Sequence, residues 1–132
     1  MSLMKAERLS VFLCGAAGYG LCELLWRGYT HISMLILGGI CFLGLYESEK
    51  RFSSLPLLVR CVSGGVFITS LELVTGCVVN VVLGLNVWDY SDMPMNFCGQ
   101  ICISFFFAWV MLCVPALFLC RLIADFYKKI YL

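Results

Sequence analysis

Long stretches without charged side chains constrain this chain more than any other feature of its sequence. Residues 101–120 contain no Asp, Glu, Lys or Arg, and other long apolar runs lie earlier in the chain. A transmembrane helix needs about 20 mostly apolar residues to cross roughly 30 Å of hydrocarbon. The 132 residues therefore have room for four or five crossings and for almost nothing else.

The composition excludes a soluble domain. Charged residues make up 13% of the chain and hydrophobic residues 62%, whereas soluble domains carry roughly a quarter charged residues. The chain has no Walker-type glycine loop, long charged tail or linker rich in Pro or Ser. Nothing therefore supports nucleotide hydrolysis or nucleic-acid binding by this chain. We expect a multi-pass protein of the cell membrane, with the lipid bilayer as its first partner and no nucleic acid.

We predict an all-α polytopic membrane protein, a bundle of four transmembrane helices that forms one domain over residues 1–132. The four spans are predicted at about residues 9–26, 32–46, 61–85 and 98–124. The third apolar region begins earlier than its span, so its first turns are expected at the membrane interface. Pro115 falls inside the last span, where a proline is expected to kink the helix.

Most basic residues fall on one side of this four-span arrangement. They lie at the N-terminus, near the middle hairpin of residues 47–54 and in the C-terminal tail: Lys5, Arg8, Lys50, Arg51, Arg60, Arg121, Lys128 and Lys129. Only Arg27 lies on the other side. Cytoplasmic loops of membrane proteins carry the excess of Lys and Arg. We therefore predict that both termini are cytoplasmic and that residues 27–31 and 86–97 are outside.

The nine cysteines lie mostly inside apolar runs, and no two of them form a Cys-x-x-Cys pair. This pattern is typical of small hydrophobic side chains rather than of a disulfide framework or a zinc site. We therefore expect no metal site and no cofactor.

One loop gathers acidic and amide groups between two apolar runs and contains no Lys or Arg. It covers residues 86–100 and carries Asn86, Asp89, Asp92, Asn96 and Gln100. Asp89 and Asp92 could bind a cation or a basic substrate through oxygen ligands, or could cap the following helix. Both interpretations stay open. We interpret Trp88, Tyr90 and Trp26 as an aromatic belt at the membrane interface.

Two further groups point toward the same outer face. Glu23 and Arg27 are four residues apart, in the order that favours a helical ion pair, and His31 continues that stripe if the helix extends. The pair is either an interfacial anchor or part of a site. His31 is either a solvated or capping residue or a proton carrier.

The third span carries a polar stripe. Thr69, Glu72, Gly76 and Asn80 share one helical face, and the glycine lets a neighbour come close. On the fourth span, Gln100 and Ser104 are expected one turn apart. An ionisable side chain inside a membrane is costly and is a functional hypothesis by default. Glu72 is the strongest such residue, although it could also join helices as a structural hydrogen-bonding group.

Three stretches carry a family resemblance: residues 23–39 (ELLWRGYTHISMLILGG), 68–80 (ITSLELVTGCVVN) and 86–102 (NVWDYSDMPMNFCGQIC). The chain resembles a family of small bacterial membrane proteins described as putative ABC-transporter type IV, or CmpB-like. The resemblance implies a transport role and an ATPase partner, with residues 47–54 as the cytoplasmic coupling element. The family pattern falls on these positions: Glu23, Arg27, Gly28, Thr30, His31, Ser33, Met34, Glu72, Gly76, Asn80, Trp88, Asp89, Tyr90, Ser91, Pro94, Asn96, Gly99 and Gln100.

We therefore expect a membrane transport protein or transporter component, with an outward-facing polar site built around Glu72. The candidate residues for binding a substrate or a proton are Glu23, Arg27, His31, Glu72, Asn80, Asp89, Asp92, Asn96 and Gln100. So small a bundle has little interior, so the pathway is expected between two copies of the chain or within a larger complex. The alternatives are a membrane-embedded enzyme acting on a lipid-linked or extracellular substrate, and a non-catalytic subunit of a membrane complex.

Overall fold

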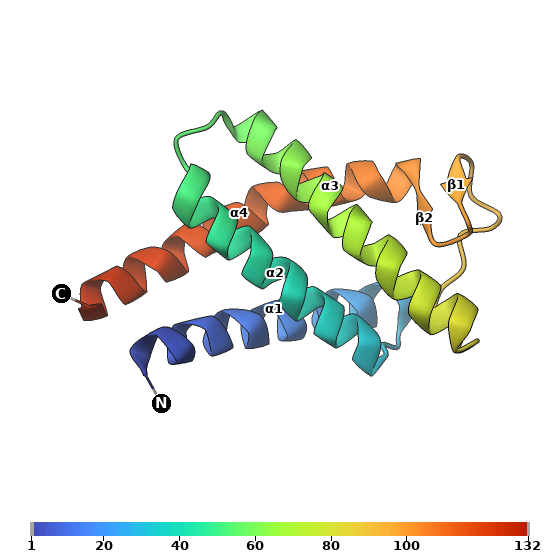
Figure 1. Ribbon diagram of the computed structural model, residues 1–132, viewed down its shortest axis with the longest axis horizontal. Helices are drawn as coiled ribbons and strands as arrows, with labels where there is room; N and C mark the ends of the chain where they lie inside the picture. Colours follow the sequence, from blue (N-terminus) through green and yellow to red (C-terminus); the bar gives the residue numbers. More distant parts are fainter. Residues whose placement is uncertain (1, 132) are drawn as a thin grey trace. The chain divides into compact units, whose positions relative to one another are not determined.

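The structure is a computed structural model that describes residues 2–131 (Figure 1). The described elements are α1 (Leu3–Arg27), α2 (Ile32–Phe52), α3 (Leu57–Gly76), the π-helix η1 (Cys77–Val82), β1 (Asn96–Phe97), β2 (Ile101–Cys102) and α4 (Ile103–Tyr131). Helices account for 78% of the structure, and the two strands form only a short antiparallel pair. The predicted all-α class is confirmed.

Within residues 2–131, four helical stretches are long and apolar enough to cross a membrane. They are Leu3–Arg27, Ile32–Phe52, Leu57–Val82 and Ile103–Tyr131. Large apolar side chains along them are exposed, for example Leu25 on α1 and Phe118 on α4. Such side chains are expected where a helix faces lipid rather than water. The prediction of four membrane-spanning helices is confirmed at this level, and the membrane boundaries within them stay a prediction.

The chain divides into two compact units, and each is described by itself. The first contains α1, α2 and the part of α4 from Pro115 onward, and the second contains residues 57–114. The division falls at Pro115 inside α4. A proline there has no N–H to donate to the carbonyl one turn earlier, so the helical hydrogen-bond ladder is interrupted at that residue. The kink that we expect at Pro115 stays a prediction.

Local signals set the ends of α1 and α2. Ser2 caps the start of α1, where its hydroxyl accepts from the Lys5 N–H at 3.3 Å. Gly28 closes α1 in a left-handed conformation (φ 80°) and donates its N–H to the Leu24 carbonyl at 3.0 Å. This is the common way for a glycine to end a helix. Helix α1 does not extend to His31, which instead caps the start of α2, so His31 does not continue the stripe of Glu23 and Arg27.

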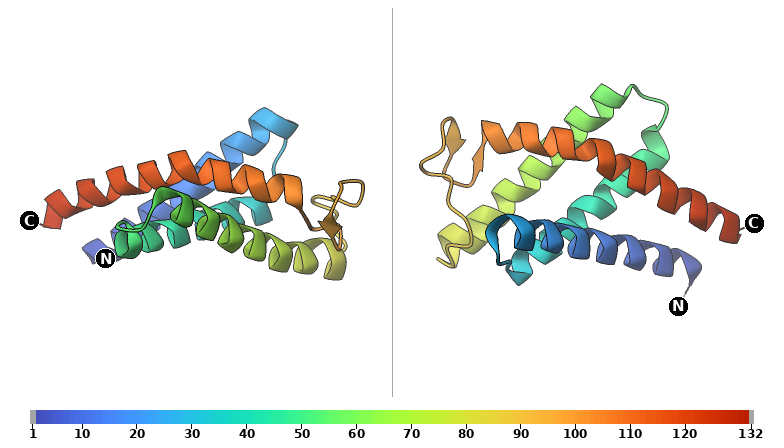
Figure 2. Two further views of the ribbon diagram at one scale, coloured as in Figure 1. Left: turned by 90° about the horizontal axis from the view of Figure 1, so that it is seen from above. Right: turned by 180° about the vertical axis from the view of Figure 1, so that it is seen from behind.

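Glycines let α1 and α2 pack closely in the first unit (Figures 1 and 2). A Cβ on Gly15 would meet the Phe42 side chain, and it would lie 2.8 Å from the Gly38 carbonyl oxygen and 3.2 Å from the Cα of Gly39. Backbone therefore lies against backbone at this crossing. Small residues serve this purpose in membranes, where helices associate through close packing rather than through expulsion of water.

We predict that Gly15→Ala destabilises the α1–α2 pair, whereas Gly18→Ala does not. The added methyl group on residue 15 has no room, and overpacking costs about 1–3 kcal/mol. A Cβ on Gly18 meets nothing within 4 Å, and alanine has the higher helix propensity. Thermal unfolding of the two purified variants in detergent measures the difference. Equal midpoints for the two variants would contradict this packing.

The second unit departs from the predicted helix boundaries at two places. The regular part of the third helical stretch ends at Gly76, and the chain continues as the π-helix η1. Helix α4 begins at Ile103, later than the span expected from residue 98, because β1 and β2 pair just before it. The pairing joins Asn96 to Cys102 and Phe97 to Ile101. The sequence before α4 is therefore a hairpin rather than the first turn of a helix.

Candidate functional site

The carboxylate of Glu72 is the most deeply buried acidic group in the second unit. Glu72 lies on α3 and is 1% exposed. Its Oε2 accepts from the Tyr90 hydroxyl at 3.2 Å, and its Oε1 accepts from the indole Nε1 of Trp109 at 3.4 Å. Tyr90 comes from the polar loop and Trp109 from α4. Three separate parts of the unit therefore meet at this carboxylate.

Aromatic rings hold the two donors in place. Tyr90 stacks on Phe105, with ring centroids 4.8 Å apart and an interplanar angle of 10°. Phe105 in turn lies 6.5 Å from Trp109, measured between ring centroids. Stacked aromatic pairs add stability beyond the area that they bury. The carboxylate therefore lies beside a row of aromatic rings, and the two rings that donate hydrogen bonds to it are uncharged.

Asn80, in the π-helix η1, connects this helical stretch to the loop. Its Oδ1 accepts from the backbone N–H of Val87 at 2.6 Å, and its Nδ2 donates to Oε1 of Gln100 at 2.8 Å. The indole Nε1 of Trp88 donates to the carbonyl oxygen of Gln100 at 3.0 Å. Both ends of the polar loop are thus bound to one asparagine and to each other. These hydrogen bonds give buried polar groups the partners that water would otherwise supply.

Gly76 makes this contact possible. A Cβ at this position would lie 2.6 Å from Oε1 of Gln100 and 2.9 Å from the Trp88 ring. The last turn of α3 therefore packs directly against the loop, as the sequence predicts for a small residue in the polar stripe. The π-helix follows at once, and such wide turns are frequent at functional sites.

Inside the loop, polar side chains are held mainly by their neighbours. Oδ1 of Asp89 accepts from the Ser91 hydroxyl and, at 2.9 Å, from the Ser91 N–H. These two hydrogen bonds lower the pKa of the exposed Asp89 carboxyl. Asn96 donates to the Met93 carbonyl at 2.9 Å and accepts from the Gly99 N–H at 3.0 Å. Asp92 is exposed.

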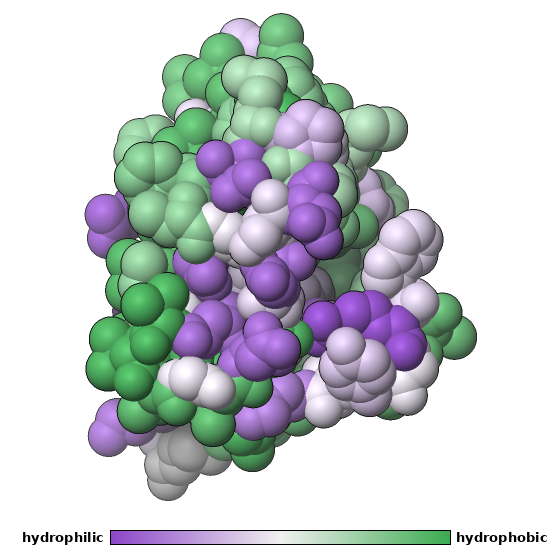
Figure 3. Space-filling view, turned by 90° about the vertical axis from the view of Figure 1, so that its right-hand side faces the viewer, coloured by the Kyte–Doolittle hydropathy of each residue, from purple (hydrophilic) through white to green (hydrophobic). Residues whose placement is uncertain are grey.

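The two interpretations of Asp89 and Asp92 are only partly resolved by these contacts. Asp89 caps a turn within the loop and does not cap α4, which begins at Ile103. Among residues 2–131, no group of three or more His, Cys, Asp or Glu side chains is placed to hold a metal ion. Figure 3 looks onto the end of the structure that carries this loop and shows hydrophilic side chains exposed among hydrophobic ones.

The other predicted residues belong to the first unit. Arg27 Nε donates to Oε2 of Glu23 at 2.6 Å, so the predicted ion pair is confirmed. The Arg27 guanidinium also lies over the Tyr29 ring, 4.6 Å from its centroid. Nδ1 of His31 accepts from the Ser33 N–H at 3.1 Å and lies 2.8 Å from the Ser33 hydroxyl. His31 is therefore a capping residue, one of the two roles that we considered.

The structure thus brings together part of the predicted set. Glu72 bonds to Tyr90 of the polar loop, and Asn80 bonds to Gln100 at the end of the same loop. The loop residues Asp89, Asp92 and Asn96 lie in the same unit. Glu23, Arg27 and His31 lie in the other unit. A common pocket for both sets stays a prediction.

One interpretation of the loop is wrong, and a second is still a prediction. Gln100 and Ser104 are not one helical turn apart, because Gln100 precedes the first residue of α4. Trp88 is 5% exposed and Tyr90 bonds to Glu72, so both side chains have partners inside the unit, and their place in an aromatic belt stays a prediction. Trp26, in contrast, is 82% exposed. The sequence carries a signal for these contacts, because Trp88 and Tyr90 lie in a loop rich in polar residues. A buried indole or phenol needs a hydrogen-bond partner, and such a loop supplies one.

Sequence reasoning also missed Glu7. This residue is 4% exposed on α1 and accepts hydrogen bonds from α2 and α4. The spacing of the sequence could have indicated its burial, because Glu7, Val11 and Gly15 follow one another every four residues on the buried face of α1. The cysteines follow the prediction in part: within residues 2–131 none of them forms a disulfide and five are buried, but Cys14, Cys22 and Cys98 are exposed.

The four apolar helices define a multi-pass membrane protein. The sequence profile of the family described as Putative ABC-transporter type IV matches residues 23–131. The chain belongs to this family, as the resemblance predicts. No curated protein and no solved structure matches the chain.

We predict that Asn80→Ala releases the polar loop. The substitution leaves the Val87 N–H and Oε1 of Gln100 without the partners described above, and an unmade buried hydrogen bond costs about 1–3 kcal/mol. Limited proteolysis of the purified protein should cleave residues 83–102 faster than in the wild type. Asp92→Ala, a change at an exposed loop position, serves as the control. Equal cleavage of the Asn80→Ala and wild-type proteins would contradict this role of Asn80.

Proposed function

We propose that this chain is a membrane transport protein or a transporter component whose polar site is centred on Glu72. In this proposal the Glu72 carboxylate binds a cationic substrate or exchanges a proton for it. The neighbouring Asn80, Gln100 and loop residues form the entrance from the outer side. Membership of the ABC-transporter-related family supports the general role, and the local geometry supports the site.

The burial of the Glu72 carboxylate carries the proposal. Its exposed fraction is 1%, in a helical stretch apolar enough to cross a membrane. An acidic residue at the centre of such a helix costs about 2.5–3.5 kcal/mol by insertion scales. A glutamine in its place would form hydrogen bonds at lower cost. A charge-changing role explains the carboxylate better than a purely structural one.

The surroundings of Glu72 suit a group that changes its charge. The phenol of Tyr90 and the indole of Trp109 donate hydrogen bonds to it at 3.2 and 3.4 Å, which is longer than the most favourable distances for such bonds. Uncharged donors stabilise a carboxylate less than a cation does. The carboxylate can therefore bind a proton or a cation while these rings stay in place.

We also propose the orientation and the location of the chain. The distribution of Lys and Arg supports cytoplasmic termini and an external polar loop. The proposed location is the cell membrane, and the family resemblance supports a bacterial source.

A pathway for a substrate needs more surface than one small chain provides. We propose a homodimer or a larger membrane complex, with the pathway between copies. An ATPase subunit is the partner that the family suggests. The proposed cytoplasmic contact for it is residues 47–54, at the end of α2 and in the connection to α3.

We predict that Glu72→Gln abolishes ion movement while the protein still inserts and purifies. Wild-type protein is reconstituted in liposomes that contain a pH-sensitive dye, and an inside-negative potential is imposed with K⁺ and valinomycin. The wild type should acidify the lumen, and Glu72→Gln should not, because an amide cannot carry the exchanged proton. The same assay is repeated with Na⁺ and with tetramethylammonium outside, as two simple cation probes.

Glu47→Gln provides the matched control for this prediction. Glu47 is also a glutamate on a membrane-spanning helix, but its side chain is 35% exposed and pairs with Arg8 at 3.4 Å. Its amide variant should keep wild-type flux. If Glu72→Gln moves protons and both cation probes as the wild type does, the proposal for Glu72 is wrong.

A separate prediction concerns orientation. A green fluorescent protein fused after residue 132 should fluoresce in a bacterial host, and alkaline phosphatase fused there should be inactive, because the C-terminus is cytoplasmic. Insertion of the phosphatase between Asp92 and Met93 should give activity. The reverse pattern would overturn the proposed topology and leave the fold unaffected.

A further inference from the structure

A second polar site lies in the first unit, away from Glu72. A pocket of about 450 Å³ is bounded by the end of α2 and the last turns of α4, with Glu7 of α1 also in its lining. Its charged side chains are three basic and three acidic: Lys50, Arg121 and Lys128, and Glu7, Glu49 and Asp125. The pocket is therefore balanced in charge, unlike a basic site for an anion or an acidic site for a metal ion.

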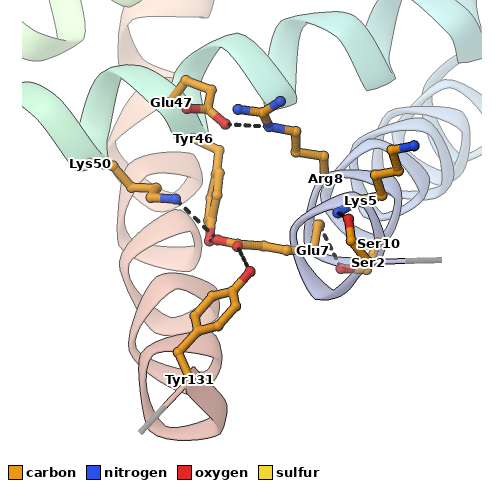
Figure 4. Close-up of polar contacts among 9 residues, drawn as sticks. All are labelled: Ser2, Lys5, Glu7, Arg8, Ser10, Tyr46, Glu47, Lys50 and Tyr131. Carbon is orange, nitrogen blue, oxygen red and sulfur yellow. Dashed lines mark hydrogen bonds and ion pairs between the residues drawn. The ribbon is translucent and has the colours of Figure 1, made fainter.

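Glu7 fixes one wall of this pocket (Figure 4). Its Oε1 accepts from the Tyr46 hydroxyl and from Nζ of Lys50, the latter at 3.2 Å. Its Oε2 accepts from the Tyr131 hydroxyl at 2.7 Å. Three donors from α2 and α4 thus converge on one buried carboxylate. The ammonium of Lys50 is held at the pocket wall, while 42% of its side chain is exposed.

A second ion pair fixes another wall. Arg121 on α4 donates to Oε1 of Glu49 on α2 at 3.1 Å. Glu49 is 4% exposed, whereas about half of the Arg121 side chain is exposed. The two buried acids therefore already neutralise Lys50 and Arg121 in part. Each cation keeps an outward-facing portion that a ligand can reach.

Two charged side chains in the lining of the pocket take no part in such ion pairs. The side chains of Lys128 and Asp125 are exposed, and neither makes an ion pair or a side-chain hydrogen bond within residues 2–131. They are three residues apart on α4, so both lie on the same helical face. The pocket thus presents one uncommitted ammonium and one uncommitted carboxylate beside the fixed pairs. A ligand that carries both a negative and a positive group would match them.

Apolar side chains lie next to these charges along the same helices. Leu122 and Phe126 on α4 are 49% and 60% exposed, and Phe52 at the end of α2 is 51% exposed. Each is adjacent in sequence to a residue that lines the pocket. The polar pocket therefore occurs at the ends of two membrane-spanning helices, beside surface that suits acyl chains.

We propose that this pocket binds the headgroup of a zwitterionic phospholipid with a primary ammonium, that is, phosphatidylethanolamine. The phosphate lies against Lys128 and Lys50, and the ammonium donates to Asp125. The acyl chains lie along the exposed apolar side chains of α4. This site is independent of the function proposed for Glu72.

The charge pattern selects among headgroups. A headgroup with only negative charge would meet the acidic side chains as well as the basic ones, so the balanced lining disfavours it. A choline headgroup has no N–H to donate to Asp125, and its usual aromatic cage is not what lines this pocket: Tyr131 is the one aromatic side chain in the lining described. Ethanolamine meets both requirements, since charge-assisted hydrogen bonds can form at both of its ends.

The test is native mass spectrometry of the full-length protein in detergent with three lipids of identical acyl chains. Phosphatidylethanolamine, phosphatidylcholine and phosphatidylglycerol are added at equal concentrations, and the retained lipid is counted. We expect phosphatidylethanolamine to be retained about tenfold better than phosphatidylcholine, which corresponds to one charge-assisted hydrogen bond. Asp125→Asn should remove this preference. Lys128→Gln should lower retention of phosphatidylethanolamine and phosphatidylcholine together.

Matched controls separate the pocket from general charge effects. Lys129→Gln removes a neighbouring cation that does not line the pocket, and Asp92→Asn removes an exposed acid in the other unit. Both should retain lipid as the wild type does, and circular dichroism should show the same helix content for all variants. Equal retention of the three lipids, preference for phosphatidylglycerol, or wild-type selectivity in Asp125→Asn would overturn the proposal.

A final arm distinguishes a lipid from a soluble ligand of the same chemistry. Free phosphoethanolamine is added at the concentration that was used for the lipid. We expect it not to displace bound phosphatidylethanolamine, because it lacks the acyl chains that contact α4. If it displaces the lipid at this concentration, the pocket serves a soluble zwitterion, and the lipid assignment is wrong.

Discussion

A carboxylate that leaves water must receive hydrogen-bond donors from the protein, and this requirement organises the structure. Among residues 2–131, four glutamates are buried, namely Glu7, Glu23, Glu49 and Glu72. Each accepts at least one hydrogen bond from a side chain elsewhere in its unit. Three of them accept it from a different helix, which makes the acid a connection between elements. A buried carboxylate without a hydrogen-bond donor would cost more free energy than packing against the neighbouring helix provides.

The same lack of water explains why glycines accompany these acids. Burying apolar surface against another helix gives little advantage in lipid, so close contact and hydrogen bonds must hold the helices together. Gly15 brings α1 against α2 on the helical face that also carries Glu7. Gly76 brings α3 against Gln100 one turn after Glu72. In both units, a small residue sets the approach of two elements and a buried acid then joins them.

The sequence was sufficient for features that depend on local pattern. Uninterrupted apolar runs predict the helices, and the polar stripe on the third span predicts the two residues, Glu72 and Asn80, that bond to the loop. It was insufficient where the partner is distant. Glu7 and Tyr131 are 124 positions apart, and nothing near Glu7 indicates which phenol will reach it. The hairpin before α4 was missed for a related reason, because its two-residue strands are too short to show an alternating pattern.

Glu7 and Glu72 show how surroundings give two buried carboxylates different roles. Glu7 accepts from two phenols and also from the ammonium of Lys50. Protonation of Glu7 would therefore remove an ion pair and weaken the junction of three helical segments. The donors that reach Glu72 from Tyr90 and Trp109 are uncharged, so protonation there leaves both rings with a polar partner. The first arrangement favours a permanent charge and suits a fixed wall of a pocket. The hydrogen bonds from Tyr90 and Trp109 are compatible with the change of charge that we propose for Glu72.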